Sequence, residues 1–536
     1  MSSRAPLAAL VAAGTLIALG YLAALGRDTL SPDELDHLFA ARSMSSGRGP
    51  QLPSGQLYSR GVEYSALVRT AVRLVQPVEL AVRLPSALLG IVAVMLFAGL
   101  AWRWVGPWAA VWATLFFGAA PLIVEMSRFG RFYTMQLALG LVAMGAGWRV
   151  VAAPGLATPW WHRWIWCLVA ALALTWAAAI QLTTVAVAAA FGLCLAVQGA
   201  ADLARDRRNA WRTSTPLQAA ALGLAATVIV LVANPGLAGY LRWRADAMPL
   251  WARLSGATSG YGFLLTALWE NGVACVLAAG GFVLLLRRAP RQGVFLILWL
   301  AIPVSAQALV LAWKADRFVL LALPPLFLAA GEMAALLVSA AAGRATASPA
   351  RRGRVARLAA AAALCGASVA AAALNPDLAQ RWTIIWRGKG DGWREARAIL
   401  DSSPALRAVP IGHAMPLGAL HYLGRVDFVV WLGLTEEWVP TRDGAGHAAF
   451  RPVPEGGPDV YAGVPVLVSP ASIRRRFLGR GGVVIGVNER FLTWHVVDRR
   501  LIGELAAHAT ELCHGRCGTM RLYYWPFQRE VPAPTP

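Results

Sequence analysis

Three acidic side chains and a histidine lie close together near the start of the sequence. Asp33, Glu34, Asp36 and His37 belong to the stretch "SPDELDH", residues 31–37, which follows the first long apolar run. A carboxylate at such a position could accept a proton from an attacking hydroxyl group, as a general base does. Asp33 and Glu34 are therefore the candidate catalytic residues.

The same stretch also has the pattern of a helix start. Ser31 suits the N-cap, Pro32 suits the first helical position, and Glu34 stands three residues after the cap. A capping box accounts fully for Glu34, and the favourable position of acids in a first turn accounts in part for Asp33. Both interpretations stay open at this point.

Basic side chains could supply the other half of a reaction site. They occur in connections expected on one face of a membrane, several at the edges of apolar segments: Arg60, Arg83, Arg128, Arg131, Lys314 and Arg317. Any one of them alone suits an anchor at a helix end. Together, opposite a cluster of acids, they favour a pocket for an anionic lipid head group, because the guanidinium group suits phosphate and stabilises charge on a leaving group.

Long apolar helices must position these residues. The 536-residue chain is 57% hydrophobic and only 14% charged, which is typical of a polytopic membrane protein. Most of the apolar runs are long enough to cross a hydrocarbon core of ~30 Å, and they predict about eleven transmembrane helices. The runs lie near 6–25, 84–101, 107–124, 134–152, 164–180, 182–199, 215–233, 263–286, 293–312, 318–341 and 357–374. We expect the first to be a retained anchor.

The arginine-rich charge pattern indicates the orientation. The net charge is +21, but no basic helix is interleaved with aromatic residues, which argues against a nucleic-acid partner. Dense basic runs at 205–212, 287–291 and 351–357 lie on alternate connections, which predicts that these connections are cytoplasmic. The 27–83 loop and the tail from residue 375 are then expected outside the cytoplasm.

The tail predicts a second domain. Residues 1–374 form the expected transmembrane domain, and residues 375–536 alternate helical and extended patterns, which predicts an extracytoplasmic α/β domain with a mostly parallel sheet. No glycine-rich dinucleotide fingerprint follows a predicted strand, so we assign this domain no cofactor. Cys513 and Cys517 predict a local disulfide, whereas a zinc site with His514 would be short of ligands.

Several motifs resemble the GT-C class of membrane glycosyltransferases. They are the acidic pair after the first apolar run, "AVRLPSALLG" (81–90), "PLIVEMSRFGRFY" (121–133) and "KADRFVLLALPPLFLAAGE" (314–332). The most similar branch contains aminoarabinose transferases and protein O-mannosyltransferases. The resemblance covers residues 1–374, and the tail is similar to outer-face α/β domains that some members carry.

The resemblance implies transfer of a sugar, usually with inversion, from a polyprenyl-phosphate donor on the outer face of the bacterial inner membrane. The acceptor would be a lipid, a glycan or a protein. By position, Asp33 matches the catalytic acidic residue with Glu34 beside it, and Arg83, Arg131 and Arg317 match basic positions near the donor phosphate. The candidate substrate-binding residues are therefore Arg60, Arg83, Arg128, Arg131, Tyr133, Lys314 and Arg317.

Two departures from the family leave the sugar and the acceptor open. The chain has "YSRGVEY" (58–64) where many relatives have His-Pro-Pro, and "SRFGR" (127–131) where many have Gln-Glu-Ala-Arg. Whether the protein needs a divalent cation also stays open, because metal dependence varies in the class and Asp33 and Glu34 alone are too few ligands.

Two functions of other kinds remain as alternatives. A transporter or flippase of a lipid-linked sugar would also need basic outer residues and a broken helix, such as the interruption at 180–184. Against it, charges inside the apolar runs are scarce, with Glu332 the chief case, and no paired inverted halves are evident. The third alternative is a non-catalytic scaffold whose tail binds partners.

Overall fold

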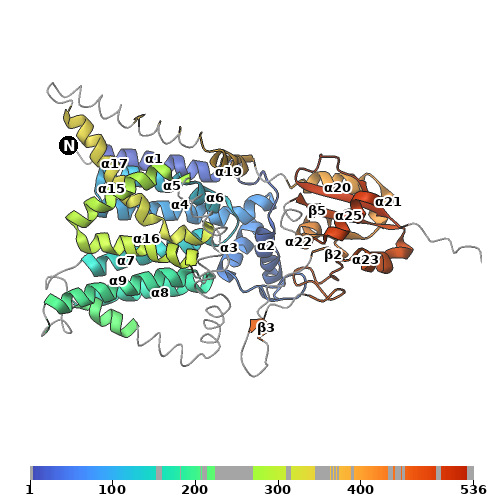
Figure 1. Cartoon of the computed structure of the whole chain (residues 1–536), viewed down its shortest axis with the longest axis horizontal. Helices are drawn as coiled ribbons and strands as arrows, with labels where there is room; N and C mark the ends of the chain where they lie inside the picture. Colours follow the sequence, from blue (N-terminus) through green and yellow to red (C-terminus); the bar gives the residue numbers. More distant parts are fainter. Residues whose placement is uncertain are drawn as a thin grey trace, which may run out of the picture. The chain divides into compact units, whose positions relative to one another are not determined.

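The structure is a computed structural model of the whole chain (Figure 1). It describes residues 4–152, 160–181, 183–205, 214–223, 270–309, 316–344, 374–387, 391–431, 453–489 and 497–527, with isolated residues between these ranges. Lys314 lies outside them, as do parts of the predicted apolar runs at 215–233, 263–286 and 357–374.

The chain folds as two compact units. Unit 1 comprises Met1–Ala24 and Arg83–Ile385, and unit 2 comprises Leu25–Val82 and Trp386–Pro536. Each unit thus combines segments that are distant in the sequence, since the first long loop packs with C-terminal residues. The predicted domains, 1–374 and 375–536, are continuous segments of the chain, and this division stays a prediction.

Unit 1 is helical. Its elements are α1 (Arg4–Leu22), most of α4 (Val78–Trp104), α5 (Pro107–Gly118), α6 (Pro121–Arg128), α7 (Tyr133–Ala152), α8 (Trp160–Ile180), α9 (Thr184–Arg205), α15 (Gly272–Arg288), α16 (Pro290–Leu309), the 3₁₀ helix η1 (Asp316–Ala322), α17 (Pro324–Arg344) and most of α19 (Pro376–Arg387). In Figure 1, α7, α8, α9 and α16 run side by side, and these helices contact one another.

The helices of unit 1 pack closely at small residues. A Cβ atom on Gly281 of α15 would collide with the Ala329 carbonyl of α17, and one on Gly331 of α17 would lie 2.5 Å from the Ala109 carbonyl oxygen of α5. Such close backbone approach is typical of helix pairs in membranes. Glycine therefore lets α17 pack directly against both neighbours.

Helix length and composition agree with a multi-pass membrane protein. Within the described ranges, six helices are long and apolar enough to cross a membrane, or up to eight if each of two bent helix pairs counts as one span. The bent pairs are α5–α6 and η1–α17, with bends of 59° and 60°. The predicted count of about eleven includes runs outside the described ranges and stays a prediction.

Unit 2 joins a helical loop region to an α/β sheet. The loop region contains α2 (Pro32–Ser45) and α3 (Val62–Leu74). The five-stranded sheet has the order β2 (Phe428–Val429), β1 (Ile411–His413), β5 (Gly482–Asn488), β7 (Met520–Pro526) and β6 (Thr510–Glu511). β2, β1 and β5 are parallel, whereas β7 is antiparallel to both β5 and β6. The prediction of a mostly parallel sheet is therefore wrong, because β7 and β6 form an antiparallel edge of the sheet. A separate two-stranded sheet pairs β3 (Val439–Pro440) with β4 (Ala448–Ala449).

Helices cover both faces of the five-stranded sheet. One apolar cluster combines α20 (Trp393–Asp401) with the segment around α22 (Pro416–Gly418) and the π-helical turn η2 (Ala419–Leu423). The other combines α23 (Pro470–Phe477) and α25 (Arg499–His508) with the opposite strand faces. Short helices α21 (Pro404–Ala408) and η3 (Leu478–Arg480) complete the domain. The predicted Cys513–Cys517 disulfide is confirmed, and both cysteines are buried in the first cluster.

Candidate functional site

The start of α2 is a complete capping box. The Glu34 backbone N–H donates to Ser31 Oγ at 3.4 Å, and the Ser31 backbone N–H donates to Glu34 Oε2 at 2.8 Å. Pro32 occupies the first turn, as predicted. Glu34 is only 1% exposed, so its side chain satisfies a buried backbone donor. The capping interpretation of Glu34 is therefore confirmed, and a catalytic role for Glu34 stays a prediction.

Variants of Glu34 should separate the two roles. Glu34→Gln keeps an acceptor for the Ser31 N–H, so we expect little change in stability, whereas Glu34→Ala should lower the free energy of unfolding by about 1 kcal/mol. Thermal unfolding of the purified protein measures this, with Glu63→Ala, an exposed acid in the first turn of α3, as the matched control. Equal destabilisation by Gln and Ala would show that the negative charge, and not the cap, matters.

His37 fixes the same helix one turn further on. It is fully buried, its Nδ1 lies 2.9 Å from Ser65 Oγ, and its ring packs edge-on against Tyr58 and Tyr64. Residues four apart lie on the same side of a helix, so His37 lies one turn from half-buried Asp33 on the same side of α2. The histidine thus holds the α2 face that carries the candidate base.

A tyrosine from the C-terminal part of unit 2 joins the acidic helix. Tyr461 packs against the small apolar cluster that contains Ala40 of α2, and its carbonyl accepts the Ser54 N–H at 3.1 Å. Burial raises the pKa of Tyr461, and the charges of Asp36 and Asp33 raise it further. The sequence around Tyr461 does not predict this contact, because nothing in its local pattern connects it with a helix more than 400 positions earlier.

Arg60 belongs to the same neighbourhood. Its side chain is exposed, and its positive charge partly offsets the rise in the pKa of Tyr461. Unit 2 therefore brings Asp33, Asp36, Arg60 and Tyr461 into one electrostatic cluster.

In unit 1, two arginines of the predicted motifs, Arg83 and Arg131, are buried. Ser86 Oγ of α4 donates to the Arg131 carbonyl at 2.7 Å and accepts the Arg131 N–H at 3.1 Å. This pair fixes the turn between α6 and α7 against the helix that carries Arg83 one turn earlier. Arg83 and Arg131 are only 7% and 5% exposed.

Two guanidinium groups share one aromatic ring. Arg131 and Arg317 lie 5.5 Å and 5.9 Å from the centre of the buried Tyr133 ring. The aromatic ring attracts each cation by a modest amount. The Arg317 Nε atom is also buried without a hydrogen-bond acceptor among the described residues.

Arg128 has a different setting. Its guanidinium donates to the carbonyls of Gly20 at 3.1 Å and Tyr21 at 3.4 Å, at the end of α1, and to that of Ile385 in α19 at 3.3 Å. These bonds satisfy carbonyls that a helix end leaves without partners. They give Arg128 a structural role, and its predicted role in substrate binding stays a prediction.

A second cluster in unit 1 holds the segment that carries Arg317. Arg381 of α19 contacts Glu125 at 2.6 Å, Glu270 at 2.6 Å and Asp316 at 2.7 Å. Asp316 begins η1 and directly precedes Arg317. No local pattern predicts this cluster, but Glu125 is an acid inside an apolar motif, which is a signal for function or pairing.

Metal ligands are few in the described ranges, where no group of three or more His, Cys, Asp and Glu side chains could hold a metal ion.

No protein-family model matches the sequence, and neither does any curated protein. Solved structures do match, and they show that the chain has the fold of the GT-C membrane glycosyltransferases, as the motifs predicted. One is ArnT from Cupriavidus metallidurans bound to undecaprenyl phosphate, with a TM-score of 0.56, 15% identity and 99% of each chain covered. Another is the archaeal oligosaccharyltransferase AglB from Archaeoglobus fulgidus with an inhibitory peptide and a dolichol-phosphate. It has a TM-score of 0.53, 12% identity, and coverage of 99% of this chain and 75% of that one.

Proposed function

We propose that this protein transfers a sugar from a polyprenyl-phosphate donor to an acceptor on the outer face of a bacterial inner membrane. The observation that supports this most strongly is the position of Arg131 and Arg317 beside the buried Tyr133 ring, in a chain with this fold. A phosphate is an anion that planar guanidinium groups hold well, through parallel charge-assisted hydrogen bonds. The crystallised ArnT is bound to undecaprenyl phosphate, which is a lipid of this chemistry.

In the proposed reaction, Asp33 accepts the proton of an acceptor hydroxyl as its oxygen attacks the anomeric carbon. The bond from that carbon to the phosphate oxygen breaks, and the phosphate leaves with the electron pair. Arg131 and Arg317 stabilise the extra negative charge. The products are the glycosylated acceptor and the polyprenyl phosphate, with the proton on Asp33. Attack opposite the leaving group inverts the anomeric configuration.

Other residues have proposed supporting roles. Glu34 and His37 hold α2 in place, and Arg60, Arg83, Arg128 and Lys314 are further candidates for contacts with the donor. The C-terminal domain is proposed to be extracytoplasmic and to take part in acceptor binding.

Arg317→Ala should weaken binding of the lipid phosphate about tenfold, because one charge-assisted contact is lost. Titration of undecaprenyl phosphate into the purified protein in nanodiscs, followed by tryptophan fluorescence, measures the affinity. Arg103→Ala is the matched control, since Arg103 is an exposed arginine in the last turn of α4. Equal affinities of the parent and the Arg317→Ala variant would contradict the proposed donor site.

A deletion strain tests the reaction itself. Mass spectrometry of its envelope glycans should show the loss of one sugar substituent, which the parental gene restores. Loss of a lipid-linked sugar from the outer leaflet, with sugar transfer by purified protein absent, would favour the flippase alternative.

A further inference from the structure

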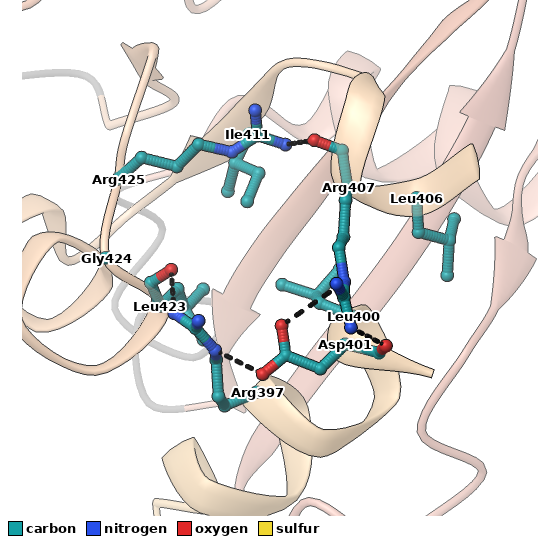
Figure 2. Close-up of a pocket in the computed structure, with 9 residues that line it drawn as sticks. All are labelled: Arg397, Leu400, Asp401, Leu406, Arg407, Ile411, Leu423, Gly424 and Arg425. Atoms are coloured by element: carbon teal, nitrogen blue, oxygen red, sulfur yellow. Dashed lines mark hydrogen bonds and ion pairs between the residues drawn. The ribbon is translucent and has the colours of Figure 1, made fainter. Parts of the chain in front are cut away.

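A pocket of about 320 Å³ lies in the C-terminal part of unit 2. Figure 2 shows its lining, which comes from α20, α21, the start of β1, the end of η2 and the turn between η2 and β2. Its residues are Arg397, Leu400, Asp401, Leu406, Arg407, Ile411, Leu423, Gly424 and Arg425. None of them belongs to the candidate site described above.

The lining has two parts. Aliphatic side chains of Leu400, Leu406, Ile411 and Leu423 form an apolar part, and three arginines with one aspartate form a polar part. The polar part therefore has an excess of two positive charges, from three guanidinium groups against one carboxylate.

Hydrogen bonds hold the arginines in place but do not use all of their N–H donors. Arg397 donates from Nε to Asp401 Oδ2 and from one terminal nitrogen to the Leu423 carbonyl, both at 2.6 Å. Arg425 donates from one terminal nitrogen to the Val409 carbonyl at 2.7 Å and to the Arg407 carbonyl at 2.5 Å. Because each guanidinium is a planar fork with donors on several sides, the remaining N–H groups stay able to bind an anion.

Arg407 completes the arrangement. Its Nε lies 3.5 Å from Asp401 Oδ1, so Asp401 bridges Arg397 and Arg407, as Figure 2 shows. Arg407 also donates to the Asp401 carbonyl, so each of the three arginines is positioned by at least one backbone carbonyl. Arg397 and Arg407 share one carboxylate, and Arg425 adds a third positive charge to the lining, so a bound anion would lower the repulsion among the three.

We propose that this pocket binds the phosphate group of a small water-soluble phosphomonoester, such as a sugar phosphate. Guanidinium forks hold phosphate through charge-assisted hydrogen bonds. The apolar part suits the carbon skeleton of the molecule that carries the phosphate. The volume lies near the lower end of the roughly 300–1,000 Å³ that small-molecule sites span, which favours a ligand of monosaccharide size.

Residue-resolved chemical protection tests this proposal in the full-length protein. Phenylglyoxal modifies accessible arginines, and peptide mass spectrometry measures the extent at each one. Inorganic phosphate and glucose 1-phosphate are expected to reduce modification of Arg407 several-fold, whereas glucose alone should not. Arg475 on α23, which is also exposed, is the internal control and should not be protected.

A variant sharpens the test. Arg397→Ala removes one cation from the pocket, and its side chain is 45% exposed, so the fold should tolerate the change. We expect about tenfold more phosphate to be needed to protect Arg407 in this variant. Absence of protection at Arg407, equal protection at Arg475, or equal protection by glucose would each overturn the proposal. The readout at Arg407 does not depend on sugar transfer, so it is independent of the proposed function.

Discussion

Replacing Asp33 by asparagine should lower the rate of sugar transfer by about 10²–10⁴-fold while the protein stays folded. Asparagine has nearly the same shape but cannot accept the proton of an attacking hydroxyl. Its effect on the helix should be limited to the lost interaction of a first-turn acid with the helix dipole, about 1 kcal/mol or less. The measurement is the transfer rate of the purified variant with the acceptor identified from the deletion strain.

Two comparisons make the Asp33→Asn result specific. Undecaprenyl phosphate should bind the variant as tightly as the parent, because the arginines are unchanged. Glu63→Gln makes the same chemical change in the first turn of α3 and should leave the rate unaffected. A transfer rate for Asp33→Asn within a few-fold of the parent would assign the acidic stretch to helix capping alone.

Arg381→Ala should lower the free energy of unfolding by about 3 kcal/mol. The change leaves Glu125, Glu270 and Asp316 close together without their shared cation, and the Glu270 side chain is only 3% exposed. Removing one partner of a buried ion pair is strongly destabilising because a charge stays buried without compensation. Chemical unfolding of the purified protein measures the loss, with Arg103→Ala as the control at an exposed position.

The Arg381→Ala defect should depend on pH. Without Arg381, the carboxylates of Glu125, Glu270 and Asp316 repel one another in the folded state. Protonation of any one of them removes part of that repulsion and is therefore favoured in the folded state. Lowering the pH from about 7 to about 5 should thus recover part of the lost stability. Adding Glu270→Gln to the variant should have the same effect at about pH 7. If neither change restores stability, the cluster is not held by charge pairing.

Local patterns in the sequence determined the features that short segments form by themselves. The capping box of Ser31 and Glu34 was predictable because all of its atoms lie within one helical turn. The long apolar helices and the GT-C-like motifs were predictable because hydrophobic length and fixed spacing can be read along the chain. The Cys513–Cys517 disulfide is likewise a short-range feature.

Only the tertiary structure decided which distant segments meet. The contact of Ser86 with the Arg131 backbone, the shared Tyr133 ring and the Arg381 cluster each join segments from different helices. Tyr461 reaches α2 across more than 400 residues, and the antiparallel pairing of β7 with β5 overrides an alternation that suggested a parallel sheet. Periodicity and capping depend on neighbours within a few residues. Side-chain clusters depend on how whole helices and strands pack, and many packings are compatible with the same local pattern.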